Sequence, residues 1–169
     1  MVTDDIWDSE VPAVKVVVGR RRMLSWLLFA IGFVMGALAI AGSALVWTNW
    51  NPAPGVMSPI AVSGLNRAEW GRWTLLLGGV LVLGGMAAGL LVGSYRSLAI
   101  VVPALAGLGL SDYSWTRTVS IPTDTLRGGK IGLGLMIVTA AYSAAIVLVA
   151  AVWIMDRHWY ATDLQLPAS

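Results

Sequence analysis

Residues 23–47 read MLSWLLFAIGFVMGALAIAGSALVW, an apolar run that sets the class of this protein. All 25 residues are uncharged, and the run follows Lys15 and the cluster Arg20, Arg21 and Arg22. A helix needs about 20 mainly apolar residues to cross the hydrocarbon of a bilayer. The apolar core of a signal peptide is shorter, about 7–15 residues. We therefore interpret 23–47 as a membrane-spanning helix.

The rest of the chain has the composition of a membrane protein. Of its 169 residues, 57% are hydrophobic and 12% are charged, whereas a soluble domain has roughly 25% charged residues. Further apolar runs lie at about 73–93, 98–110 and 130–155. The sequence therefore predicts an all-α polytopic integral membrane protein with four transmembrane helices.

The third of these runs is the shortest. Its 13 apolar residues, with Pro103 in the middle, resemble a re-entrant segment more than a full span. An extension to residue 115 would complete a span and would place Tyr113 and Trp115 at the membrane interface. Because a short hairpin usually returns the chain across the bilayer, we favour a full span and keep a re-entrant segment as the alternative.

These spans divide the chain into an N-terminal arm (1–22), a membrane domain (23–155) and a C-terminal tail (156–169). Segments 48–72 and 112–129 are expected as outer loops, since prolines in both oppose helix. Within the first loop, residues 59–63 suit an extended segment and 65–73 a short interfacial helix.

Basic residues predict the orientation. Four lie within residues 15–22, directly before the first span, which indicates a cytoplasmic N-terminus. An even number of spans returns the C-terminus to the same side of the plasma membrane. Over the whole chain the bias is small, six basic residues inside against five outside, so the first span carries the prediction.

Several function classes are disfavoured by the residues that the chain lacks. It has no cysteine and a single histidine, His158, so a cluster of such metal ligands is not expected. The spans carry charged residues only at their ends, which argues against channels, pumps and proton-coupled transporters. Nucleophile-elbow, phosphate-loop and zinc-protease motifs are missing. We expect no catalytic activity, no cofactor and no nucleic-acid partner.

Small residues recur at four-residue spacing in three of the runs. In lipid, such stripes let helix backbones approach closely. The alternative is that glycine and alanine are simply common in membrane helices. We predict helix packing, within the chain or onto a partner, through Gly32, Gly36, Gly85, Gly89, Gly93, Ala140 and Ala144, with a parallel stripe at Ala141 and Ala145.

Nine tryptophans gather mainly at predicted span ends. The simpler interpretation is an interfacial belt, because indole favours the headgroup region. The alternative is an outer surface that binds a lipid headgroup or a partner protein. That surface would comprise Trp47, Trp50, Arg67, Trp70, Arg72, Trp73, Trp115 and Arg117.

The N-terminal arm begins with four acidic residues around two apolar side chains. Such a segment is repelled by the negative cytoplasmic leaflet, and we predict that it docks on a cytoplasmic partner. The alternative is a solvated tail. The docking residues would be Asp4, Asp5, Ile6, Trp7, Asp8 and Glu10.

Short stretches over residues 24–110 carry a family resemblance. They are Trp47, 60–64 (IAVSG) and 96–99 (RSLA). With this layout of spans, the chain resembles the small actinobacterial tryptophan-operon-associated transmembrane proteins. The resemblance brings no catalytic motif and implies no activity.

Together these features favour a non-catalytic accessory or assembly subunit of a larger membrane complex, with other membrane subunits and membrane lipids as partners. Uncharged spans, small-residue faces and short polar segments support it. The alternative is a lipid-binding or lipid-handling membrane protein that uses the outer tryptophan and arginine residues.

Overall fold

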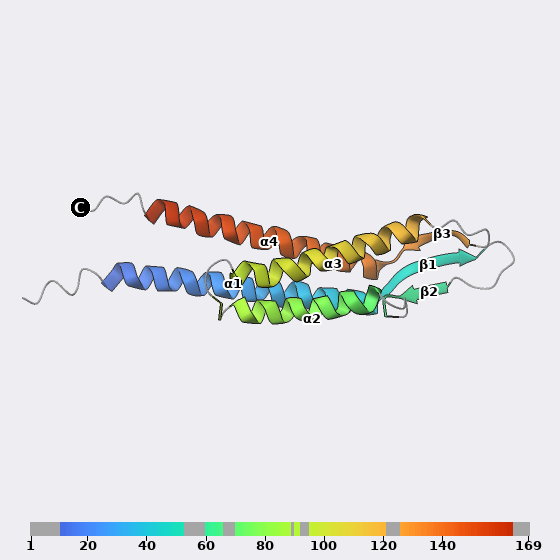
Figure 1. Cartoon of the computed structure of the whole chain (residues 1–169), viewed down its shortest axis with the longest axis horizontal. Helices are drawn as coiled ribbons and strands as arrows, with labels where there is room; N and C mark the ends of the chain where they lie inside the picture. The colour runs from blue at the N-terminus through green and yellow to red at the C-terminus, as the bar shows by residue number, and fades with distance from the viewer. Residues whose placement is uncertain are drawn as a thin grey trace, which may run out of the picture.

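The computed structural model describes residues 11–52, 60–65, 70–88, 90–91, 95–120 and 126–163. Four helices dominate them and run along one long axis (Figure 1). They are α1 (Val11–Ala44), α2 (Trp70–Ala88), α3 (Tyr95–Ser120) and α4 (Leu133–Asp163). Each is long and apolar enough to cross a bilayer, over Gly19–Ala44, Trp70–Ala88, Tyr95–Thr116 and Leu133–Trp159. The predicted all-α membrane protein with four spans is confirmed.

The first and last helices extend further than the apolar runs indicated. Helix α1 begins at Val11, inside the segment 1–22 that was expected to be an arm. Helix α4 continues to Asp163, inside the expected tail 156–169. Arginine is a good helix former, so the basic residues that flank the apolar runs do not end these helices. Figure 1 shows the start of α1 and the end of α4 extending beyond α2 and α3 at one end of the bundle.

Helix α3 is long and apolar enough for a complete span, as the favoured prediction required, and is longer than the re-entrant alternative. It has 26 residues, and it continues through the polar stretch that was assigned to the loop 112–129. The hydroxyl groups of Ser111 and Ser114 each donate a hydrogen bond, 2.9 Å long, to a carbonyl oxygen of the preceding turn. Because the helix itself supplies these acceptors, polar residues extend it without leaving donors unpaired.

Pro103 lies inside α3 without ending it. Proline has no N–H, so the carbonyl oxygen of Ala99, four residues earlier, loses its usual donor. Gly84 of α2 lies against that oxygen so closely that a Cβ atom on Gly84 would collide with it. A glycine on the neighbouring helix therefore permits close approach to the backbone group that the proline frees.

The four helices form a ring: α1 and α3 each pack mainly on α2 and α4, and α1 and α3 make a small contact with each other. Among the contacts between two helices, glycine approaches glycine most closely at the crossing of α1 and α2. A Cβ atom on Gly32 would lie 2.5 Å from the Cα atom of Gly85, and one on Gly36 would lie 2.7 Å from the carbonyl oxygen of Gly78. These distances leave no room for any side chain.

Glycines also line the two interfaces of α4. A Cβ atom on Gly134 would lie 2.6 Å from the carbonyl oxygen of Gly42 in α1. On the other side, Gly107 of α3 lies against the buried ring of Tyr142. Every neighbouring pair of helices in the ring thus has a glycine at its contact, which fits an assembly driven by close packing in lipid.

Segments expected to be loops form a three-stranded antiparallel sheet. The strands are β1 (Val46–Pro52), β2 (Ile60–Ser63) and β3 (Leu126–Ile131), in the order β2–β1–β3. Only β2 coincides with a segment predicted to be extended. Figure 1 places the sheet at one end of the bundle, which we call the sheet end; the opposite end is the pocket end.

Trp47 joins the sheet to the bundle. Its side chain is fully buried, and its indole N–H donates to the carbonyl oxygen of Gly42 at 3.0 Å. The N–H of Gly132, which precedes α4, donates to the carbonyl oxygen of Trp47 at 2.6 Å. One residue therefore ties the end of α1, the first strand and the start of α4 together.

Three buried hydroxyl groups connect α1, α2 and α4 near the sheet end. The hydroxyl groups of Ser43 and Thr74 lie 3.0 Å apart, and Tyr142 donates to the carbonyl oxygen of Thr74 at 2.6 Å. Ser43 and Thr74 each also contact a carbonyl oxygen of their own helix, at 2.8 and 2.9 Å. All three residues are fully buried. Satisfied polar groups of this kind hold membrane helices in register.

Candidate functional site

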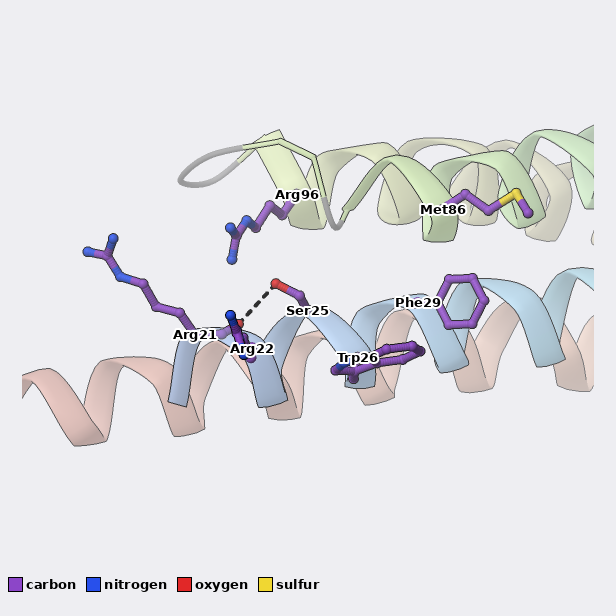
Figure 2. Close-up of a pocket in the computed structure, with 7 residues that line it drawn as sticks. All are labelled: Arg21, Arg22, Ser25, Trp26, Phe29, Met86 and Arg96. Atoms are coloured by element: carbon purple, nitrogen blue, oxygen red, sulfur yellow. Dashed lines mark hydrogen bonds between the residues drawn. The ribbon is translucent and has the colours of Figure 1, made fainter. Parts of the chain in front are cut away.

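A pocket opens between α1 and the α2–α3 hairpin at the pocket end of the bundle. Its volume is about 510 Å³, within the range of roughly 300–1,000 Å³ that is usual for ligand sites. We call it the basic pocket (Figure 2). Its described lining residues are Arg21, Arg22, Ser25, Trp26, Phe29, Met86 and Arg96.

Helix α1 supplies one wall of the basic pocket as a single face. Arg22, Ser25, Trp26 and Phe29 follow the spacing i, i+3, i+4 and i+7, which places them on the same side of a helix. Along this face the chemistry changes from a guanidinium group to a hydroxyl group and then to two aromatic rings. The wall is therefore charged near the helix start and apolar one to two turns further on.

Arg96 approaches from the opposite side. It is the second residue of α3, and its Nε–H donates to the carbonyl oxygen of Leu91 in the preceding turn. Figure 2 shows its guanidinium group pointing from α3 towards α1. Since the bond to Leu91 uses only Nε, the two terminal nitrogens remain as donors for a ligand.

The remaining polar groups of the pocket have different positions. Figure 2 shows the Arg21 side chain extending outward, away from the rings. The hydroxyl of Ser25 donates to the carbonyl oxygen of Arg21 at 2.9 Å, so it offers the pocket an oxygen lone pair and no hydrogen. The ligand donors in the described lining are therefore the arginine guanidinium groups and the indole N–H of Trp26.

The apolar part of the pocket is formed by Trp26, Phe29 and Met86. The rings of Trp26 and Phe29 meet edge to face with centroids 5.8 Å apart. The side chains of Trp26 and Met86 remain 68% and 52% exposed, so this surface faces outward and not into the core. A hydrocarbon chain would bury it.

Two other arginines at this end are held by α4. The guanidinium group of Arg20 lies 5.5 Å from the ring centroid of Trp159, and that of Arg157 lies 4.2 Å from that of Trp153. Such cation–π contacts contribute about 0.5–1 kcal/mol at exposed sites. The arginine cluster 20–22 is therefore divided: Arg20 is directed to α4, and the next two residues line the pocket.

The predicted outer aromatic surface is not assembled as expected. Trp47 is fully buried, so its assignment to an exposed surface is wrong; its indole N–H donates to a partner inside the protein, the carbonyl oxygen of Gly42.

The rings of Trp70 and Tyr113 pair with centroids 5.0 Å apart across α2 and α3. Arg72 and Trp73 are exposed, and Trp115 is half-buried. Arg67 and the side chains of Trp50 and Arg117 lie outside the described part of the structure.

The predicted packing residues are partly brought together. Gly32, Gly36 and Gly85 lie at the crossing of α1 and α2. In α4, Ala140 is exposed and Ala144 is half-buried, so Ala140 does not pack within the chain, and packing of this pair onto a partner stays a prediction. The buried stripe is the parallel one, Ala141 and Ala145, since the helix turns these residues towards the core.

The remaining predicted residues lie outside the described part of the structure. They are Gly89 and Gly93 in the second apolar run, and the arm residues Asp4, Asp5, Ile6, Trp7, Asp8 and Glu10.

The basic pocket was not predicted from the sequence, although the residue spacing of one of its walls can be found there. The arginines before the first span were interpreted only as a topology signal. The spacing from Arg22 to Phe29 places a cation and two rings on one face, which is an available sign of an amphiphile site. The position of Arg96 opposite that face depends on the packing of the α2–α3 hairpin, so no local sequence pattern predicts it.

Comparison with known proteins gives no further guide: no family model, no curated protein and no solved structure matches the chain. The resemblance to the tryptophan-operon-associated transmembrane family stays a prediction and gives no residue a role. The functional argument therefore depends on the geometry of the basic pocket.

Proposed function

We propose that this multi-pass protein is a non-catalytic component of the plasma membrane that binds an anionic lipid in the basic pocket. The observation that supports the proposal is the pairing of arginines with an apolar wall in one cavity. Guanidinium groups bind phosphate oxygens in a bidentate manner, and the neighbouring rings suit a hydrocarbon chain. The lipid-binding role considered for the outer residues is thereby moved to the other end of the bundle.

The depth of the pocket suits such a ligand. Arginines beside the first span lie where lipid headgroups lie, and each basic residue there contributes about 1 kcal/mol of attraction to an anionic surface. Trp26 and Phe29 follow one and two turns further along α1, at the depth where a lipid chain begins. The polar and apolar parts of the pocket are thus arranged in the same order as the parts of a lipid.

Membership of a larger complex, as an accessory or assembly subunit, is a second proposal. Its support is the sheet, whose order β2–β1–β3 leaves an outer edge on each flanking strand, and such edges can pair with another chain. The glycine faces no longer favour it, because Gly32, Gly36 and Gly85 pack within the chain.

The lipid proposal predicts a defined defect for Arg96→Gln. Lipid bound to the full chain purified in mild detergent would be measured by native mass spectrometry. Losing one guanidinium should lower retention of anionic lipid about fivefold, the factor that corresponds to roughly 1 kcal/mol. The control is Arg72→Gln, the same change at an exposed position near the sheet end.

The pattern of losses separates the alternatives. Equal retention by Arg96→Gln and the unchanged protein would contradict the lipid proposal, and a loss confined to Arg72→Gln would return the site to the sheet end. A stoichiometric protein partner recovered from native membranes, without bound lipid, would favour the subunit.

We propose that both termini are cytoplasmic, so that the basic pocket lies at the inner leaflet and the sheet outside. The arginine cluster before the first span supports this orientation. Because the chain lacks cysteine, single cysteines at Ser9, Ser58, Thr123 and Ser169 would report sidedness to an impermeant thiol reagent. In intact cells only positions 58 and 123 should be labelled. Labelling of position 9 from outside would reverse the orientation.

A further inference from the structure

We propose that the basic pocket selects a phosphate monoester carried on a hydrocarbon chain over a phosphodiester lipid. The inference rests on the proposed lipid-binding function and defines the headgroup. It is based on the charges and hydrogen-bond donors that line the cavity, and on the groups that its described lining lacks.

The first argument is charge. Arg22 from α1 and Arg96 from α3 line the pocket on opposite sides and Arg21 lies at its rim, while no acidic residue is among the described lining residues. A phosphodiester headgroup has one negative charge and leaves this excess largely unbalanced. A phosphate monoester carries about −1.5 to −2 at pH 7, which balances more of the positive charge that these arginines bring to the pocket.

The second argument concerns hydrogen bonding. A monoester presents three acceptor oxygens and needs donors. The terminal nitrogens of Arg96 supply them, because its Nε is already bonded to the carbonyl oxygen of Leu91. The guanidinium of Arg22 supplies more from α1. Ser25 has committed its hydrogen to the carbonyl oxygen of Arg21. The main donors to the phosphate would therefore be the arginines, because cationic donors form the stronger hydrogen bonds, and the indole N–H of Trp26 is a neutral donor in the same lining.

The third argument excludes headgroups that carry an ammonium group. Ethanolamine and serine lipids would place a positive charge beside Arg22 and Arg96. The described lining offers no carboxylate to pair with an ammonium group, and the hydroxyl oxygen of Ser25 is a neutral acceptor that does not offset the repulsion. A bare phosphate on an apolar chain avoids this repulsion. Phosphatidic acid and prenyl phosphates share that chemistry, and the two sources can be separated by experiment.

The pH dependence of binding follows from the ligand. The charged groups facing the headgroup are Arg21 and Arg22 from α1 and Arg96 from α3; α2 contributes the uncharged Met86. Arginine stays protonated throughout the accessible pH range, and His158 is on α4 and does not line the pocket. The second ionisation of a phosphate monoester has a pKa of about 6. Lowering the pH below that value removes one negative charge and should weaken the preference.

The test is a competition between lipids for the full chain in phosphatidylcholine nanodiscs, read by native mass spectrometry. At pH 7.5 phosphatidic acid should be bound about fivefold more strongly than phosphatidylglycerol, the effect of about one additional charge. At pH 5.5 the ratio should fall towards one. A parallel arm with a prenyl monophosphate compares the two apolar chains: stronger binding of either assigns that source, and equal binding assigns the phosphate alone.

Variants assign the effect to the pocket. Arg22→Gln and Arg96→Gln should each reduce the preference for phosphatidic acid, whereas Arg157→Gln, at the same end but over the ring of Trp153, should not. Equal binding of phosphatidic acid and phosphatidylglycerol would overturn the inference and leave the lipid-binding function standing. Binding of neither above phosphatidylcholine would overturn both.

Discussion

Gly85→Leu is expected to destabilise the bundle by about 3 kcal/mol or more. The Cβ atom of a residue at position 85 would lie 2.9 Å from the Cα atom of Gly32 and 3.0 Å from the carbonyl oxygen of Phe29. Both are backbone atoms, so the side chain can be accommodated only if α1 and α2 separate. Overpacking a tight interior costs about 1–3 kcal/mol and sometimes more, and we expect a loss at or above the upper end. Thermal unfolding in detergent, followed by circular dichroism, would measure it.

The chain contains a matched control in the same helix. Gly79 has no atom within 4 Å of the position where its Cβ would be. Gly79→Leu makes the same chemical change and adds the same helix propensity, so it should leave the unfolding temperature close to that of the unchanged protein. Equal losses for both variants would mean that the effect comes from the leucine itself and not from the crossing with Gly32.

The spans were predictable because the bilayer imposes a strong local requirement. Every backbone polar group in hydrocarbon must be bonded within the segment, so an uncharged run such as 23–47 is expected to be helical; α1 covers it as far as Ala44, while Val46 and Trp47 belong to β1. Helix α3 was harder, since Pro103 and the polar residues around Ser111 disguise its length. Its completion depends on a contact from another helix, Gly84 against the carbonyl oxygen of Ala99.

The sheet was not predictable in the same way. Strand β1 pairs with β3 between residues far apart in sequence, as in the pairs Thr48 with Ile131 and Asn49 with Lys130. Strand preference depends on such partners more than on the segment itself, and β3 contains two adjacent glycines that disfavour a strand. Only the extended segment around β2 had a local signal.

The basic pocket is an intermediate case. Its α1 wall follows from helical spacing alone, because Arg22 and Trp26 are four residues apart. Its opposite wall depends on how the α2–α3 hairpin places Arg96 beside α1. A charged and aromatic face can therefore be found from the sequence, although it was not predicted, whereas the cavity that makes it a candidate site is a property of the packed bundle.

Trp47→Ala tests the most consequential correction to the sequence interpretation. Tryptophan at a span end usually lies at the membrane interface, where its loss would matter little to folding. Here the ring is fully buried at the junction of α1, β1 and α4, and its N–H bonds to the carbonyl oxygen of Gly42. Removing a buried tryptophan side chain costs about 3–5 kcal/mol, so we expect a large fall in the unfolding temperature in detergent.

Two companion variants separate burial from hydrogen bonding. Trp47→Phe keeps most of the apolar ring but removes the donor to Gly42, and it should cost about 1 kcal/mol. Trp73→Ala removes a side chain that is 55% exposed and should change the unfolding temperature little. If the alanine variants at 47 and 73 lost stability equally, Trp47 would not be the residue that joins the sheet to the bundle. A loss for Trp47→Phe as large as for Trp47→Ala would instead assign the anchoring to the indole N–H.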